Sequence, residues 1–207
     1  MESSSTARRD EESLLSGLAT VFRAMEQAKA FGEDTSRDGA RLFGHIPHVA
    51  PRAWLHIQYP PLQNPDIAEI ERAIRRPVPS AYAQLLRITN GLTLFGGSLS
   101  LFGRRTDYSR DPAVRQPFDL SIPNLKERPR AAKDHWFIFA FYDQDGSLAY
   151  LDGETPTVYR ADRAMSNPTL NEWTNLGVFL SSETARLGAL FDERGRPVVT
   201  GRPTTPV

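Results

Sequence analysis

Histidines are the side chains of this sequence best suited to proton transfer or metal binding near neutral pH, and there are four of them. Three of these, His45, His48 and His56, share one stretch of the chain. No carboxylate follows them at a metal-ligand spacing, and Pro47 disfavours a common helix face, so we interpret them as loop histidines. A hydrolase would need a site centred on His135, which has no evident serine partner. We interpret His135 as a polar residue at the edge of a predicted strand.

A second group of chemically suitable residues lies in two acidic turns. Asp143, Asp145, Ser147 and Glu154 fall at positions one, three, five and twelve of a calcium loop, but Leu148 stands where the loop must bend sharply. The segments on either side are predicted strands, whereas a calcium loop of this kind needs helices. We interpret the turns as hairpin tips with solvated carboxylates that could contact a basic partner. These candidate contacts are Asp143, Asp145, Asp152 and Glu154.

The glycine-rich segment 96–103 has no recognisable catalytic or cofactor motif. It lacks the Gly-Lys-Ser/Thr ending of a phosphate loop, the spacing of a dinucleotide fingerprint and the Gly-x-Ser-x-Gly elbow of a hydrolase. Its glycines are therefore predicted to be turn residues. We expect no cofactor, no metal and no catalytic residue, and hence a binding protein that is not an enzyme.

Composition limits the class of protein further. The chain has 207 residues, 40% of them hydrophobic, which is enough for one core. Lysine and arginine number 25, as do aspartate and glutamate, so no overall field attracts nucleic acid or an anionic membrane. The absence of cysteine, of a signal sequence and of a membrane-length apolar run predicts a cytoplasmic location. We expect a flexible N-terminus (1–12), one domain (13–197) and a loose C-terminal tail (198–207).

Apolar spacing and turn residues predict the elements of that domain. Apolar residues recur at helical spacing over 14–28, which predicts an amphipathic helix packed on the core. Residues 45–61 are rich in proline and should run extended, with at most one short strand. Helices are predicted to start at Asn64-Pro65 and at 79–80, the second ending at Gly91. Strands are predicted at 98–103, 136–142, 148–151 and 157–159. A C-terminal helix is predicted to start at Asn167-Pro168 and to carry Trp173, and Gly177 is a candidate for an interruption of it.

Residues 104–119 form a polar stretch too long and too irregular for a tight turn. The stretch contains four arginines and three aspartates, and we predict a surface loop that contacts a partner. The candidate partner-binding residues of this loop are Arg104, Arg105, Asp107, Tyr108, Arg110, Asp111 and Arg115.

The order of these pieces resembles the SUKH superfamily, which includes fungal Smi/Knr-type cell-wall regulators and many bacterial immunity proteins. Its motif is a Pro-x-x-Tyr-x-x-Leu-Leu helix that ends in Asn-Gly. The resemblance covers residues 54–191 and leaves out the first helix and the 104–119 loop. The segments that carry it are 54–62, Arg76-Pro77-Val78-Pro79, Tyr82, Leu85-Leu86, Asn90-Gly91, 99–103, 137–146 and Trp173.

The resemblance implies an α+β fold with a central, largely antiparallel sheet flanked by helices, here with an extra N-terminal helix. It implies no cofactor and a surface that binds another protein. The first functional hypothesis is an immunity protein that neutralises a cognate toxin domain. The alternatives are an intracellular scaffold or regulator of the Smi/Knr type and, third, an unrecognised hydrolase that uses His135.

Overall fold

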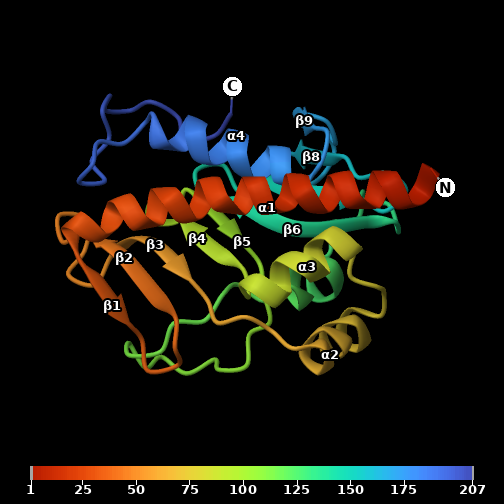
Figure 1. Cartoon of the computed structure of the whole chain (residues 1–207), viewed down its shortest axis with the longest axis horizontal. Helices are drawn as coiled ribbons and strands as arrows, with labels where there is room; N and C mark the ends of the chain where they lie inside the picture. Colours follow the sequence, from red (N-terminus) through yellow and green to blue (C-terminus); the bar gives the residue numbers. More distant parts are fainter. Residues whose placement is uncertain (1, 207) are drawn as a thin grey trace.

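The computed structural model describes the backbone of residues 2–206 and the side chains of residues 8–206 (Figure 1). In this part of the chain nine strands form one sheet, and each strand pairs antiparallel with the next in sequence. The predicted α+β fold with a central antiparallel sheet is therefore confirmed. The strands are β1 (Glu33–Thr35), β2 (Arg41–His45), β3 (Trp54–Gln58), β4 (Leu92–Leu94), β5 (Leu99–Leu101), β6 (Trp136–Tyr142), β7 (Leu148–Asp152), β8 (Val158–Ala161) and β9 (Asn171–Trp173).

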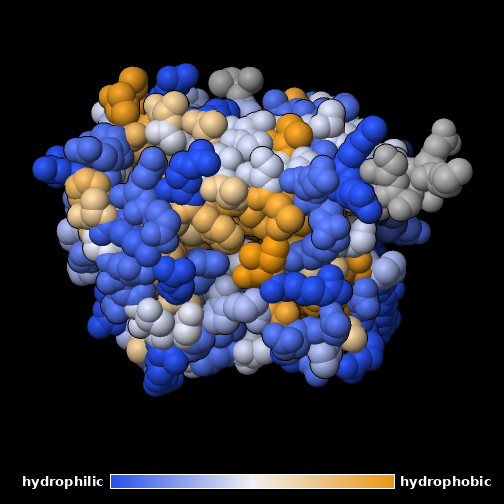
Figure 2. Space-filling view, viewed as in Figure 1, coloured by the Kyte–Doolittle hydropathy of each residue, from blue (hydrophilic) through white to orange (hydrophobic). Residues whose placement is uncertain are grey.

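Four longer helices accompany the sheet in the described residues, and two of them lie side by side. Figure 1 shows α1 running the length of the molecule beside α4, with α2 and α3 together at one end. Figure 2 shows that polar side chains cover most of this face, with an apolar area around the middle of α1. The helices are α1 (Glu2–Ala28), α2 (Asn64–Ile74), α3 (Ser80–Ile88) and α4 (Leu176–Gly188), with short turns η1 (Lys29–Phe31), η2 (Phe95–Gly97) and η3 (Ile122–Lys126).

Helix α1 carries the predicted apolar stripe, and this stripe is buried from Leu14 to Ala28. The helix starts earlier than the sequence indicated, at Glu2, so most of the segment 1–12 that we expected to be flexible is helical; Met1 lies outside the described residues. Alanine, arginine and glutamate in this segment are good helix formers. At Ser13 the hydroxyl donates to Asn175 Oδ1 at 2.8 Å, which fixes the helix to the residue that precedes α4.

The C-terminal helix begins later than predicted. Asn167-Pro168 does not start a helix; the edge strand β9 intervenes, and the helix cap is Asn175, whose Oδ1 accepts the Val178 backbone N–H at 2.9 Å. Trp173, expected on the helix, lies in β9, where its ring meets Phe179 edge-on at 5.0 Å. A polar strand of three residues has no clear alternation of apolar and polar side chains. Its sequence therefore cannot be told from the first turn of a helix.

Gly177 does not interrupt the helix. It lies in the first turn of α4 and faces Gly17 of α1. A Cβ on Gly17 would overlap the Gly177 carbonyl, and a Cβ on Gly177 would overlap the Ser13 carbonyl of α1. The absence of two side chains thus sets how closely α1 and α4 approach.

Residues 45–61 contain one short strand, β3, as predicted, whereas β1 and nearly all of β2 precede this stretch and were not predicted. β2 and β3 pair from Arg41↔Gln58 to His45↔Trp54, and β1 adds a third strand before them. Pro47 and Pro51 lie in the connecting turn, where a missing backbone N–H costs no ladder bond.

Strand β6 is buried along nearly its whole length, as predicted for a central strand. A register shift between Ile138 and Ala140 interrupts the simple alternation of its faces. As a result, Phe139 contacts Phe179 of α4, and Tyr142 also reaches α4, where its hydroxyl donates to Glu183 at 2.9 Å.

The C-terminal tail is more firmly attached than we predicted. Arg186 donates to the Thr204 carbonyl at 2.7 Å, Arg160 donates to the Pro206 carbonyl at 2.8 Å, and Thr205 is only 8% exposed. Two arginines thus hold residues of the 198–207 segment through its backbone; Val207 lies outside the described residues. Among the helices described, none combines the length and apolar character needed to cross a membrane.

Candidate functional site

The 104–119 loop runs beneath β1–β3 in Figure 1, and its first residue is an anchor. The backbone N–H of Arg104 donates to Asn90 Oδ1 at 2.6 Å, and Asn90 Nδ2 returns a bond to the Arg104 carbonyl at 2.8 Å. The Arg104 guanidinium pairs with Asp66 at 2.6 Å and also with Glu69, both on α2. Because its backbone and its charge are already paired, we assign Arg104 a positioning role within the fold.

The far half of the loop is fixed to the β1–β2 turn and to the β2–β3 turn. The Arg115 backbone N–H donates to Asp38 Oδ1 and its side chain donates to the Arg52 carbonyl, both at 2.9 Å. Asp111 forms an ion pair with Arg37 at 2.8 Å. The loop therefore has a defined shape although it is irregular.

The loop also covers a small second core that is separate from the main one. This cluster lies on β2, β3, the residue before β2 and the residue after β3, and it packs against Trp54. Lining residues of the loop, among them Thr106 and Arg115, surround Tyr59 in a shallow pocket. Apolar packing beneath the loop adds to the hydrogen bonds at its ends. The buried members are Ala40, Leu42, Ile57 and Tyr59.

An aromatic ring stands exposed at the tip of the loop. Tyr108 is 58% exposed, with the Arg105 guanidinium 4.9 Å and the Lys126 ammonium 6.0 Å from its ring centre. Its hydroxyl bonds to Asp119, and this bond raises the pKa of Tyr108. Burial alone raises the pKa of Asp119, but hydrogen bonds from Tyr108 and Ser121 outweigh it and lower that pKa.

The neighbours of this ring leave free groups for a partner. Asp107 accepts the Ser109 backbone N–H at 2.6 Å, which shapes the turn and lowers the pKa of Asp107. Arg110 is exposed and makes no side-chain bond to any described residue. Phe118 is 48% exposed and rests edge-on against Phe141 at 4.7 Å. We give the name tip surface to the exposed Tyr108 and Arg110 together with the half-buried Arg105 and Asp107.

The acidic turns do not form the single cluster that we predicted as a basic-partner contact. Asp143 and Asp145 precede the start of β7, whereas Asp152 is its last residue and Glu154 follows it. Asp145 is also engaged, since its carboxylate pairs with the nearly buried Arg160 at 2.5 Å. Hydrogen bonds from Ser147 and the charge of Arg160 outweigh burial and lower the pKa of Asp145.

At that other end of β7, the structure brings His135 close to the carboxylates of Asp152 and Glu154. His135 Nε2 lies 3.6 Å from Asp152 Oδ1, and His135 Nδ1 lies 3.9 Å from Glu154 Oε1. Pairing of Trp136 with Asp152 in the β6–β7 ladder creates this proximity.

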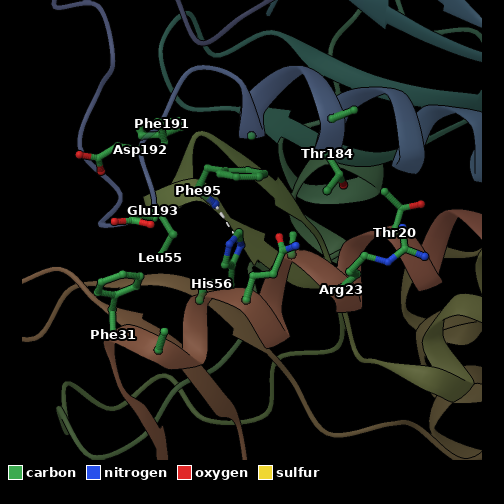
Figure 3. Close-up of a pocket in the computed structure, with 16 residues that line it drawn as sticks. Thr20, Arg23, Phe31, Leu55, His56, Phe95, Thr184, Phe191, Asp192 and Glu193 are labelled. Carbon is green, nitrogen blue, oxygen red and sulfur yellow. Dashed lines mark hydrogen bonds between the residues drawn. The ribbon is translucent and has the colours of Figure 1, made fainter.

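A groove of about 590 Å³ opens beside α1, near the end of α4 (Figure 3). Its walls include Leu55, Phe95 and Phe191, and His56 lies among them. His56, interpreted from sequence as a loop histidine, is instead buried in β3, where its Nδ1 accepts the Phe95 backbone N–H at 3.5 Å. Burial lowers the pKa of His56 to about 3. A base this weak is poorly matched to proton transfer at neutral pH, so the groove suits apolar contact better than acid–base chemistry.

A family model described as the SMI1 / KNR4 family (SUKH-1) matches residues 61–182, which is more than half of the chain. The chain belongs to this family. No curated protein matches the chain significantly. The SUKH-1 match extends from the residues before α2 into α4 and includes the tip surface, whereas α1 and β1–β3 precede it. The SMI1/KNR4 family is generally non-catalytic.

The Asn90-Gly91 pair of the SUKH motif has a clear physical role in this SUKH-1 chain. Asn90 holds the start of the 104–119 loop, as described above. Gly91 has φ of +82°, and a Cβ there would meet the Leu101 carbonyl. The motif therefore packs the end of α3 closely against β5, and it fixes where the 104–119 loop begins.

Proposed function

We propose that this chain is a non-catalytic protein-binding module that neutralises a cognate toxin by covering it, as an immunity protein does. The observation that carries the proposal is the exposed Tyr108, flanked by two cations on a loop that is fixed at both ends. Tyrosine and arginine are over-represented among residues that dominate binding energy. A loop already ordered before binding loses less entropy when it docks.

Family membership supports the same proposal, because SUKH-1 proteins are generally not enzymes. The tip surface carries two arginines and one aspartate, so we expect a partner with an acidic patch and an apolar recess for the tyrosine ring. Arg104, Asp111 and Arg115 do not belong to the tip surface. Their ion pairs and hydrogen bonds, described above, hold the loop that carries it.

Co-expression tests the proposal. The partner to use is a toxin domain encoded beside the gene for this chain, and the readout is survival of the host cell. We expect wild-type protein to rescue growth and Tyr108→Ala with Arg110→Ala to lose rescue while remaining folded. Arg194→Ala, an exposed arginine far along the chain in the turn after α4, is the matched control and should rescue fully. Full rescue by the double variant would reject the tip surface, and failure of the wild type with every neighbouring toxin would reject the immunity function.

A scaffold or regulator of the SMI1/KNR4 type is the second candidate, since the matching family carries that name. It predicts stable complexes with other intracellular proteins and no toxin gene nearby. The third hypothesis, a hydrolase centred on His135, requires a hydrolytic activity that His135→Ala abolishes.

A further inference from the structure

The side chains of His135, Asp152 and Glu154 converge at the end of β7, on positions set by the backbone. Trp136 pairs with Asp152 in the ladder, and the Gly153 backbone N–H donates to the His135 carbonyl at 2.9 Å. A Cβ on Gly153 would overlap that carbonyl, so the close approach requires glycine. The Glu154 backbone N–H then donates to Asp152 Oδ1 at 3.0 Å, which turns the chain so that both carboxylates face the imidazole.

From this arrangement we propose that His135, Asp152 and Glu154 bind one Zn²⁺ ion. One ligand atom from each residue can be chosen so that all three lie within 4.8 Å of one another. Zinc–nitrogen and zinc–oxygen bonds of about 2.0–2.2 Å place neighbouring ligands of a tetrahedral site roughly 3.3–3.6 Å apart. The separation of 3.6 Å between His135 Nε2 and Asp152 Oδ1 already fits this value. Glu154 is 73% exposed in its side chain, so it is free to turn toward the same ion.

The charge balance of the cluster favours a cation. The Asp152 side chain is only 18% exposed, yet within the described chain neither Asp152 nor Glu154 forms an ion pair with lysine or arginine. Carboxylates removed from water are normally paired or bound to a metal. Among the described residues, His135 is the one basic side chain within 4 Å of these carboxylates, and a neutral imidazole is a common metal ligand.

The ligand set selects the class of metal, and a groove provides access to it. One imidazole and two carboxylates suit zinc and similar transition metals, whereas Ca²⁺ and Mg²⁺ prefer six or more oxygen ligands. Asp152 and Glu154 line a groove of about 850 Å³, to which α1 contributes Arg8, Asp10 and Glu11. The groove leaves room for water to complete the coordination. This proposal does not depend on the tip surface or on the identity of a partner.

Calorimetric titration of the full chain, without a histidine tag, with ZnCl₂ tests the proposal. We expect one ion per chain, and Co²⁺ in its place should give the visible absorption of a tetrahedral site. His135→Ala removes the one nitrogen ligand and should weaken zinc affinity more than about tenfold. Mutation of residues that only hydrogen-bond to a metal ligand already weakens metal affinity by about that factor. Glu154→Gln changes an exposed side chain, so it should lower affinity without affecting folding.

Two controls separate this site from non-specific binding. His48→Ala removes an exposed histidine elsewhere and should leave zinc affinity unchanged. Excess Mg²⁺ should not compete. The proposal is overturned if wild-type protein binds no zinc at millimolar concentration, or if His135→Ala and Glu154→Gln both bind zinc as tightly as wild type.

Discussion

Gly17 of α1 and Gly177 of α4 face each other so closely that a Cβ on Gly17 would overlap the carbonyl of Gly177. Helix α1 lies before the matched family region and α4 lies at its end, so this pair fixes the additional helix to the family domain. Small residues allow helix backbones to approach in this way. Any added side chain must push the two helices apart.

We therefore predict that Gly177→Ala destabilises the protein. Overpacking at a rigid contact costs about 1–3 kcal/mol, and the better helix propensity of alanine returns at most about 1 kcal/mol. Urea denaturation should show a lower unfolding midpoint with an unchanged slope. The matched control is Gly188→Ala at the end of the same helix, where the new Cβ would lie 3.8 Å from Phe95, an ordinary contact. The control should be neutral or slightly stabilising, and equal effects of the two changes would contradict the packing argument.

The buried hydroxyl of Tyr82 gives a second prediction. It donates to the carbonyls of Phe102 and Phe139, and burial raises the pKa of Tyr82 well above its usual value, so the hydroxyl remains a donor. Tyr82→Phe leaves buried acceptors without this donor and should cost about 1–3 kcal/mol in the free energy of unfolding. Tyr159→Phe is the control, because the Tyr159 hydroxyl bonds to no described residue, and it should change stability by less than about 0.5 kcal/mol. The idea fails if both variants unfold at the same denaturant concentration.

His56 predicts how stability depends on pH. Its folded pKa of about 3 lies below the unfolded value near 6.5, because burial disfavours the charged ring. The unfolded state therefore binds more protons, and this contribution is complete above pH 6.5 and declines as pH falls toward 3. By pH 4 the loss from this one residue amounts to about 3 kcal/mol.

Denaturation measured between pH 6.5 and 4.5 checks this, because most carboxylates are still ionised in that window. His56→Asn keeps an acceptor near the Phe95 N–H but does not titrate, so its stability should be nearly flat there. His48→Ala should retain the wild-type slope. If His56→Asn showed the same slope as wild type, another group would be responsible.

The sequence predicted best the elements whose signals are local. The alternation around β5, the aromatic run of β6 and the helix starts near Asn64 and Ser80 all appear within two residues of the predicted places. Strand β9 and the cap at Asn175 were missed because three half-exposed residues carry no periodicity. Gly177 was misread because a glycine that permits helix contact and one that ends a helix look identical in sequence.

The candidate sites were predictable only in part, because they depend on contacts between distant residues. Arginines and a tyrosine in a long loop indicated a contact surface. The sequence could not show that Arg104 is bound to α2 while the Arg110 side chain bonds to no described residue. The proximity of His135 to Asp152 arises from the β6–β7 register, across a separation of 17 residues in sequence. No local spacing carries that information.

The C-terminal segment provides the last prediction. The side chain of Arg160 is almost fully buried, and its guanidinium bonds to Asp145, Asn171 and the Pro206 carbonyl. Deletion of residues 204–207 removes that carbonyl together with the Thr204 carbonyl that Arg186 contacts. Hydrogen bonds to charged groups are worth about 1.5–3 kcal/mol, so truncation should lower stability by at least about 2 kcal/mol.

Thermal unfolding of the truncated chain measures this loss. Thr204→Ala in the full-length protein is the control, since it keeps both backbone carbonyls and removes only the hydroxyl that bonds to Gln144. We expect it to be nearly neutral because that contact is exposed. A truncated chain as stable as the full-length protein would mean that the tail is loose in solution and that water replaces both carbonyls at no cost. Loss of stability only on truncation would show that the backbone of the tail completes the buried arginine network.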